Sequence, residues 1–470
     1  MVPIQAVERD GFKQLLKTLD PRYTLPGRKY FSETALPKLY ESCRQTLAHE
    51  VQKVLHFATT TDLWTSRTSE PYLSLTAHFI DETWQLQSYC LQTSYFPDDH
   101  TGDIIAQGLK DALASWSLPE DRMVCMTTDS GANVVSALRI NNWQRLPCFG
   151  HRLHIAIERS MRDPRIDRAI GVCKKMVAAF SSSWKKKKAL ADAQEQLKLP
   201  QHKLITESPT RWGSRQRMIE RFLEQEKAIR HVLTADKKHR HLVPTWQDVE
   251  VLEAVSKVLA VKSDDTELTK KIKQTILEYL NTKYSEDCVE ELLSLASTLD
   301  PRFKNRYNND GRIKTIETAV TAELLAMVTE EDSPTPGPST AAQATTVEPE
   351  AGDASEPAKK TKKSFGSYFK KPQEFRGESL HIAIEKEIQS YLMIPEVDSD
   401  VNPLDWWKTQ EINFPRLGKL AKKYLCIPAS SSPSERAFST GGNIVTCHRA
   451  ALKPDAVDRL VFLSHNLKRM

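Results

Sequence analysis

The sequence predicts a mixed α/β core joined to a long helical part, so that the chain is helix-rich overall. Residues 54–128 contain short runs of apolar and Thr side chains, separated by turns and by one segment with helical spacing. Residues 215–280 instead carry long helical patterns with charged faces. Acidic residues follow two of the apolar runs, which suggests that the α/β core carries a chemical site.

The first three predicted strands read as antiparallel neighbours. Residues 54–62 are rich in Thr and apolar side chains, and residues 72–80 alternate in part between apolar and polar. Asp81 and Glu82 form a plausible turn into a third strand over 83–93.

A helix and a fourth strand follow. Residues 102–118 place one set of apolar side chains on roughly one face: Ile104, Ile105, Leu109, Leu113 and Trp116. Residues 123–128 form the next strand, and a helix begins near Ala132. Three strands, a helix and a further strand is the order of a ribonuclease-H-like fold, in which the ends of the first and fourth strands lie side by side.

Three acids are candidates for a site on that core. Asp62 and Asp129 each end one of the apolar strands, and Glu435 lies more than 300 residues later. Hard Mg²⁺ or Mn²⁺ ions prefer carboxylate oxygen, and two such ions can stabilise the attacking and leaving oxygens at a phosphodiester. We therefore expect Asp62 and Asp129 to meet, and Glu435 to complete the set of catalytic and metal ligands.

Composition excludes several classes of protein. The 470 residues are 40% hydrophobic and 27% charged, with a formal net charge of +5. No apolar run approaches the roughly 18 residues of a membrane span, and the amino terminus lacks the pattern of a signal peptide. Eight cysteines occur without CxxC pairs, which favours free thiols over a disulfide framework. An intracellular protein with no membrane partner is expected.

One segment breaks the globular pattern. Residues 331–375 are predicted to be a disordered linker, because they are rich in Pro, Ala, Thr and Ser and contain few large aliphatic side chains up to residue 363. Four lysines between Lys359 and Lys363 form a basic cluster within it. The cluster is either a solvated charge run or a nuclear localisation signal, and we favour the signal because such a setting leaves it accessible.

Cys148 and His151 stand at a spacing that metal ligands can adopt. No second Cys/His pair lies nearby to complete a tetrahedral site, so no structural zinc is expected. We favour a buried cluster at the start of a helix that borders and supports the acidic site.

Two segments are candidates for DNA contact. Arg211 and Trp212 offer a phosphate contact and a stacking platform, although a core tryptophan beside a surface arginine would look the same. Four consecutive lysines from 185 to 188 must in part face solvent. They form either a solvated helix surface or, through Lys185 and Lys186, a contact with DNA phosphates.

The carboxyl end carries two apolar stripes. One contains Trp406 and Trp407 with further apolar side chains up to Leu425, and the other contains Leu460 and Leu463 within residues 457–467. The stripes either close the core or form a dimer interface, and surplus apolar surface favours an interface.

These motifs, in this order, resemble the hAT-superfamily DNA transposases and most closely their domesticated BED-zinc-finger (ZBED) relatives. The resemblance covers nearly the whole chain. It rests on six segments: Thr18 to Tyr23, Thr60 to Ser66, Thr127 to Asp129 with Cys148 to His151, Pro209 to Trp212, Leu299 to Lys304, and Ile427 to Ser439.

The resemblance implies a domain plan and residue roles. It implies a helical segment over 1–50, a ribonuclease-H-like core over 51–214, a helical insertion over 215–400, and a dimerisation region over 401–470 that completes the core. Asp62, Asp129 and Glu435 match the family's DDE triad. Trp212, with Arg211 beside it, matches the tryptophan that stacks on a flipped base, and Cys148 with His151 matches a C-x-x-H motif. We expect that no BED finger precedes residue 1, so that the module that would recognise specific DNA is missing or was lost.

Two functions of different classes follow from the resemblance. The first is a domesticated nuclear protein, dimeric or of higher order and DNA-associated, that regulates transcription. The second is an active transposase that uses Mg²⁺ or Mn²⁺ for DNA cleavage and strand transfer. Neither acts on a small-molecule substrate. The three retained acids favour the enzyme and the missing BED finger favours the regulator, which we prefer. Terminal inverted repeats flanking the gene would favour the enzyme.

Overall fold

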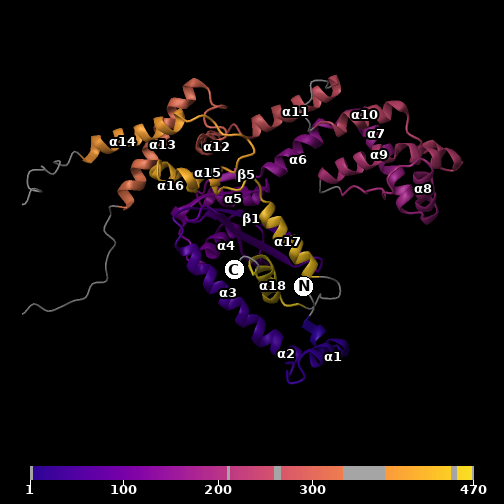
Figure 1. The fold of residues 1–470 in the computed structure, drawn as a ribbon, viewed down its shortest axis with the longest axis horizontal. Coiled ribbons are helices and arrows are strands. Elements are labelled where there is room, and N and C mark those ends of the chain that lie inside the picture. The colour runs from indigo at the N-terminus through magenta and orange to yellow at the C-terminus, as the bar shows by residue number, and fades with distance from the viewer. Residues whose placement is uncertain (1–3, 209–211, 259–265, 332–375, 446–451, 468–470) are drawn as a thin grey trace, which may run out of the picture. The chain divides into compact units, whose positions relative to one another are not determined.

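The computed structural model describes residues 4–208, 212–258, 266–331, 376–445 and 452–467. It contains a five-stranded sheet in the order β3-β2-β1-β4-β5. Figure 1 labels β1 and β5 of this sheet. The strands are β1 (Phe57–Thr65), β2 (Pro71–Ile80), β3 (Leu86–Tyr95), β4 (Met123–Thr128) and β5 (Arg145–Pro147). β1 pairs with β2, and β2 with β3, in antiparallel register, whereas β4 is parallel to both β1 and β5. This topology confirms the predicted ribonuclease-H-like fold.

The position of Asp62 differs from the prediction. The sequence suggested that the first strand ends at Asp62, but β1 continues to Thr65 because its pairing with β2 extends to Thr65 opposite Pro71. On the other side, pairing with β4 ends where Thr60 lies opposite Thr127. Asp62 is therefore inside a strand, but just beyond the part that β4 covers.

The helices are numerous and fall in several groups. The amino-terminal group is α1 (Asp10–Leu19), α2 (Arg28–Tyr30) and α3 (Leu36–Gln52), and the core then adds α4 (Gly102–Ser115) and α5 (Ala132–Ile140). A helical part follows: α6 (Phe149–Ser160), α7 (Pro164–Ser181), α8 (Trp184–Gln196), α9 (Trp212–Ala235), α10 (Trp246–Ser256) and α11 (Glu267–Lys283). The rest are α12 (Asp287–Leu299), α13 (Asp310–Glu331), α14 (Arg376–Met393), α15 (Pro403–Gln410), α16 (Pro415–Leu425), α17 (Ser432–Ile444) and α18 (Pro454–Asn466). Among the described residues, no helix is long and apolar enough to cross a membrane.

The carboxyl-terminal helices are built into the core of the sheet. Phe462 and Leu463 of α18 belong to one buried cluster with side chains of α3, α4, α5 and the strands. A second cluster joins Phe438 of α17 and Val461 of α18 to Tyr72 and Cys90. The Asn466 side chain also donates to the Cys90 carbonyl at 2.7 Å and accepts from its N–H at 3.1 Å, which satisfies backbone groups of the edge strand β3.

The helical part begins earlier in the chain than the sequence suggested. The last strand, β5, ends at Pro147, and α6 starts at Phe149 rather than near residue 215. Side chains of α6 to α11 share one buried apolar cluster, which includes Ile170, Phe180 and Phe222. The boundary at residue 214 followed from the family resemblance, and the structure instead places α6, α7 and α8 before it.

The chain divides into two compact units, Met1–Leu293 with Lys422–Met470 and, separately, Ser294–Ala421. The second unit is organised around Tyr391 and Trp407. Their rings stack at 5.3 Å, and the indole N–H of Trp407 donates to the Leu299 carbonyl at 2.9 Å. The Lys304 ammonium donates to the Tyr391 carbonyl at 2.6 Å, which secures the segment between α12 and α13.

Candidate active site

Asp62 lies on the face of β1 that α17 covers. Side chains alternate along a strand, so Thr60, Asp62 and Trp64 share one face. The Thr60 hydroxyl is 2.7 Å from the Ser434 hydroxyl, and the Trp64 ring stacks on Phe438 at 5.5 Å. Asp62 is thus between two contacts that join β1 to α17.

A glycine permits the close approach of α17 to this face. A Cβ atom at Gly441 would lie only 3.2 Å from the Trp64 ring. A side chain at this position would require the Trp64 ring to shift by a few tenths of an ångström, so the glycine suits the close packing of α17 on β1.

Asp129 follows β4 directly. Thr60 of β1 lies opposite Thr127 of the parallel strand β4. Asp62 and Asp129 each come two residues later, so they leave the paired region at the same end of the two strands. The Asp129 carboxylate accepts the Gly131 N–H at 3.0 Å. Arg145 of β5 fixes the backbone here, donating to the Thr128 hydroxyl at 2.9 Å and to the Asp129 carbonyl.

Glu435 arrives from the far end of the sequence in the first turn of α17. The segment before it is attached to the core by three hydrogen bonds. The Thr127 hydroxyl donates to the Pro428 carbonyl at 2.7 Å, the Phe149 N–H donates to the Ala429 carbonyl at 2.9 Å, and the Ser431 N–H donates to the Cys148 thiol at 3.3 Å. These bonds, together with that of Ser434, direct the start of α17 toward β1 and β4.

The three acids influence one another electrostatically. The pKa of Asp62 is raised from 3.8 to about 7, mainly by burial, then by repulsion from Asp129 and, more weakly, from Glu435, against the lowering effect of the Leu63 N–H. A carboxyl group with such a pKa holds its proton about half the time at neutral pH. The site is therefore one where a cation would relieve repulsion.

The donor set fits a hard divalent ion, since three carboxylates of high charge density suit Mg²⁺ or Mn²⁺. Among the described residues, however, no three side chains of His, Cys, Asp or Glu lie close enough to form a metal-binding group as they stand. Binding of an ion to all three acids would require them to draw closer together.

Cys148 and His151 lie on the start of α6, beside this site. Cys148 caps the helix, is buried, and holds the segment before Glu435 through the Ser431 N–H. His151 follows one turn later and is half-buried. The Cys148 thiol thus joins the start of α6 to the segment that precedes Glu435.

The prediction from sequence missed the two arginines near the site, Arg145 and Arg152. Arg145 lies on β5, a strand of three residues that the sequence did not predict. Burial and, to a lesser extent, the neighbouring Arg152 guanidinium lower the pKa of Arg145, and Asp129 opposes this effect. Arg152 donates to the Tyr279 hydroxyl at 3.3 Å, but its Nε is buried without a hydrogen-bond partner in the described part of the chain.

Two candidate DNA contacts, Arg211 and Trp212, are adjacent in the sequence at the point where α9 begins. Arg211 lies outside the described residues, and Trp212 is the first residue of α9. The residues on either side are held together, because the Ser208 N–H donates to the Ser214 hydroxyl at 2.7 Å and Arg215 pairs with Glu207 at 2.7 Å.

Lys185 is exposed on α8, as a phosphate contact requires. Lys186 is not available in the same way. Its ammonium lies 3.4 Å from Asp236 and 3.0 Å from Nδ1 of His239, and only 13% of its side chain is exposed. We correct the expectation for Lys186, because a pair with a neighbouring carboxylate occupies it.

Burial also changes the expected dimer contacts. Trp407 is 0% exposed in the core of its unit, and Leu463 is 7% exposed in the core of the sheet. Neither can present its side chain to a partner, so their assignment to the interface is corrected. Trp406 and Leu460 are half-buried. The same part of the chain instead exposes Met393 at 81% and Ile412 at 91%.

The fold and its ordered acids define a ribonuclease-H-like protein with a helical domain and a carboxyl-terminal closing region. Comparisons with known families agree. Residues 60–144 match the ZBED1 RNase-like domain, residues 146–258 match the ZBED1 RNase-like helical domain, and residues 387–467 match the hAT family C-terminal dimerisation region. The chain thus contains a hAT-type dimerisation region and ZBED1-like RNase domains.

Individual relatives are distant but cover almost the whole chain. The human zinc finger BED domain-containing protein 4 is 24% identical over 99% of this chain, which spans 42% of the human protein. The Arabidopsis thaliana protein DAYSLEEPER, also a zinc finger BED domain-containing protein, is 23% identical over 98% of the chain and 70% of its own length. A Zea mays protein that carries the name AC transposase is 23% identical over 98% of the chain and 62% of its own length.

Proposed function

We propose that this chain is a hAT-transposase-derived nuclear protein that forms a homodimer, associates with DNA and regulates transcription. The observation that carries the proposal is the dimerisation region at residues 387–467, in a chain that aligns over 99% of its length with a ZBED protein. A dimer presents two copies of any DNA-contacting surface, and such bivalence raises the strength of binding without new contacts.

The test of this proposal is DNA association in cells and in solution. Purified full-length chain should be dimeric by light scattering at micromolar concentration, and should bind labelled DNA with an affinity that falls steeply with salt. A monomer, or a protein that binds no DNA at low salt, contradicts the proposal.

The nuclear address is assigned to the four lysines between Lys359 and Lys363, which lie outside the described residues. Replacing all four with Gln should move a tagged chain from nucleus to cytoplasm. The matched control replaces Lys13, Lys17, Lys38 and Lys53, four exposed lysines, and should leave localisation unchanged. If the first variant still accumulates in the nucleus, another segment carries the nuclear localisation signal.

A second candidate function is metal-dependent DNA cleavage. The raised pKa of Asp62, caused partly by Asp129 and Glu435, favours it because the three acids lie within electrostatic reach. Mg²⁺ or Mn²⁺, held by these acids, would act as a Lewis acid that activates water and stabilises the leaving oxygen.

The chain's own residues would support this reaction by orientation. Arg145 holds the backbone at Asp129, and the Thr60–Ser434 hydrogen bond holds the turn that bears Glu435. Asp62 must lose its proton to serve as a ligand, so activity should rise with pH through about 7.

Nicking or hairpin formation on duplex DNA tests the enzyme directly. The wild type should cleave with Mn²⁺ or Mg²⁺, and Asp129→Asn should not. Identical cleavage products from the wild type and the variant would reject cleavage by this site. The transcriptional regulator would then remain as the proposed function.

A further inference from the structure

Two lysine-rich segments that are about fifty residues apart in sequence lie side by side in the helical part. Residues 184–190 start α8, and residues 236–242 follow α9. Lys186 joins them, contacting Asp236 at 3.4 Å and His239 at 3.0 Å, while His239 contacts Asp236 at 2.8 Å. Leu190 and Leu242, at the ends of the two segments, are buried in the same apolar cluster.

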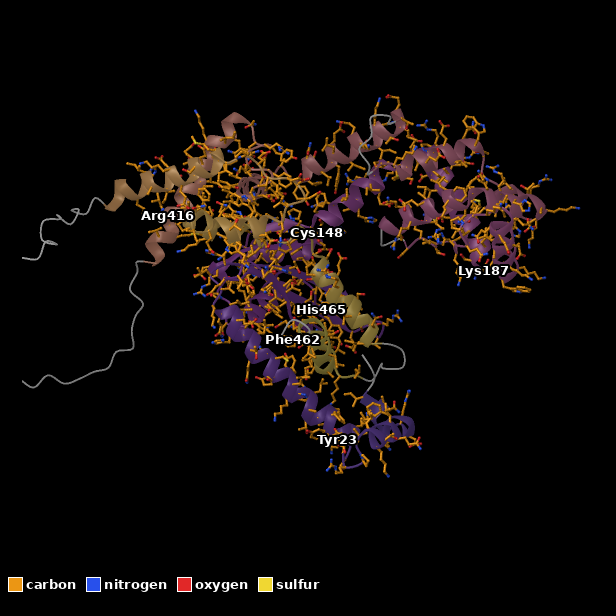
Figure 2. All side chains as sticks on the ribbon, viewed as in Figure 1. Tyr23, Cys148, Lys187, Arg416, Phe462 and His465 are labelled. Atoms are coloured by element: carbon orange, nitrogen blue, oxygen red, sulfur yellow. The ribbon has the colours of Figure 1, made fainter. Side chains whose placement is uncertain are left out.

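The remaining cations of these segments are exposed. We call them the α8 basic surface: Lys185, Lys187, Lys188, Lys237, Lys238 and Arg240. Asp236 is the only acid in the two segments, and Lys186 and His239 already engage it. Figure 2 labels Lys187 among the side chains that project from this end of the helical part.

Like charges gathered in this way repel one another unless an anion lies over them. The Lys186–Asp236–His239 contact holds the two segments together despite that repulsion. Within the two segments, no unpaired acid lies between the six cations, so these residues are complementary to a polyanion with closely spaced charges.

An exposed aromatic ring borders the same surface. Trp184 is the first residue of α8 and is 71% exposed. The Ser183 hydroxyl accepts the Lys186 N–H at 3.4 Å, which caps the helix and fixes the position from which Trp184 projects. An aromatic platform beside a row of cations is the combination by which proteins bind single-stranded nucleic acid, with bases stacked and phosphates neutralised.

We propose that the α8 basic surface binds a DNA strand, with phosphates on its six cations and one unpaired base stacked on Trp184. The proposal rests on the DNA association proposed above and names a surface for it. An acidic protein would use the cations but leave the exposed ring unexplained, whereas a DNA strand with an unpaired base uses both.

The test measures binding of the full-length chain to a labelled single strand of about 20 nucleotides and to the matching duplex, by fluorescence anisotropy over a series of salt concentrations. The test variant neutralises four cations of the surface: K187Q, K188Q, K237Q and K238Q. The control removes the same charge from exposed lysines of other segments: K13Q, K17Q, K38Q and K53Q.

The test variant should bind the single strand at least about tenfold more weakly at about 0.1 M salt, and the slope of log affinity against log salt should fall by about 0.7 for each lost contact. The control should stay within about twofold of the wild type. Equal losses in both variants, or no loss in either, overturn the proposal. A wild type that binds neither DNA refutes the proposed DNA association itself, so the two failures are distinguishable.

Substitutions of Trp184 distinguish the contribution of base stacking from that of charge. Trp184→Ala should weaken binding of the single strand by about fivefold or more and leave the duplex nearly unchanged, and Trp184→Phe should recover most of the loss. A loss that is equal on both DNAs would show that Trp184 stacks on no base and would remove the base from the proposal.

Discussion

Replacing Asp62 by Asn should stabilise the metal-free protein at alkaline pH. The pKa of this carboxyl is raised from 3.8 to about 7, so the folded chain holds a proton that the unfolded chain has lost between these two values. Stability therefore decreases as pH rises from about 4 to 7, and the full cost is present above 7. At about 1.4 kcal/mol for each pKa unit, this cost is about 4 kcal/mol, and solvent screening of the half-buried group reduces it to about 2 to 4 kcal/mol.

The assay is chemical denaturation of the wild type and Asp62→Asn at pH 8 and pH 5, in buffer with a chelator. The variant should unfold at higher denaturant at pH 8, and its advantage should fall to less than about 2 kcal/mol at pH 5. Asp10→Asn removes a carboxylate from an exposed position of α1 and should change neither value. An Asp62→Asn variant that is no more stable than the wild type at pH 8 would contradict a raised pKa of Asp62 in the folded chain.

Three other outcomes are expected. Mn²⁺ at about 100 times its dissociation constant should increase the free energy of unfolding of the wild type by about 2.7 kcal/mol and so raise its thermal midpoint. An equal shift in Asp129→Asn would contradict binding at these acids. Thr60→Val removes a buried hydroxyl that bonds to Thr76 and Ser434 and should cost about 1 to 3 kcal/mol in denaturant; an unchanged midpoint would deny that this contact supports α17. Ile412→Asp should weaken the dimer in light scattering and keep the fold, whereas Leu463→Asp should lower the thermal midpoint, and a dimer unaffected by Ile412→Asp would move the interface to another surface.

The first strands were predictable because their signals are local. Thr-rich apolar runs and the turn at Asp81 define β1 to β3 without knowledge of their partners. The short β5 and the function of Arg145 were not predictable, because a three-residue strand has no periodicity to detect.

Long-range hydrogen bonds and the burial of individual side chains could not be predicted from the sequence for a different reason. The bond between Thr60 and Ser434 joins residues 374 positions apart, and no local pattern specifies it. In the same way, helical spacing groups Leu460 with Leu463, but only the packed sheet determines that Leu463 is buried and Leu460 is partly buried. Lys186 looked equivalent to Lys185 until Asp236 was placed beside it.

The late arrival of α17 and α18 has a consequence for synthesis on the ribosome. When β1 to β4 have left the exit tunnel, Tyr72 and Cys90 still lack the Phe438 and Val461 side chains that cover them. At about 5 to 20 residues per second, the missing helices follow only after roughly 15 to 60 s. During that interval the edge strand β3 lacks Asn466 and is open to pairing with other chains, so a nascent chain of this protein should depend on chaperones until its last helix is made.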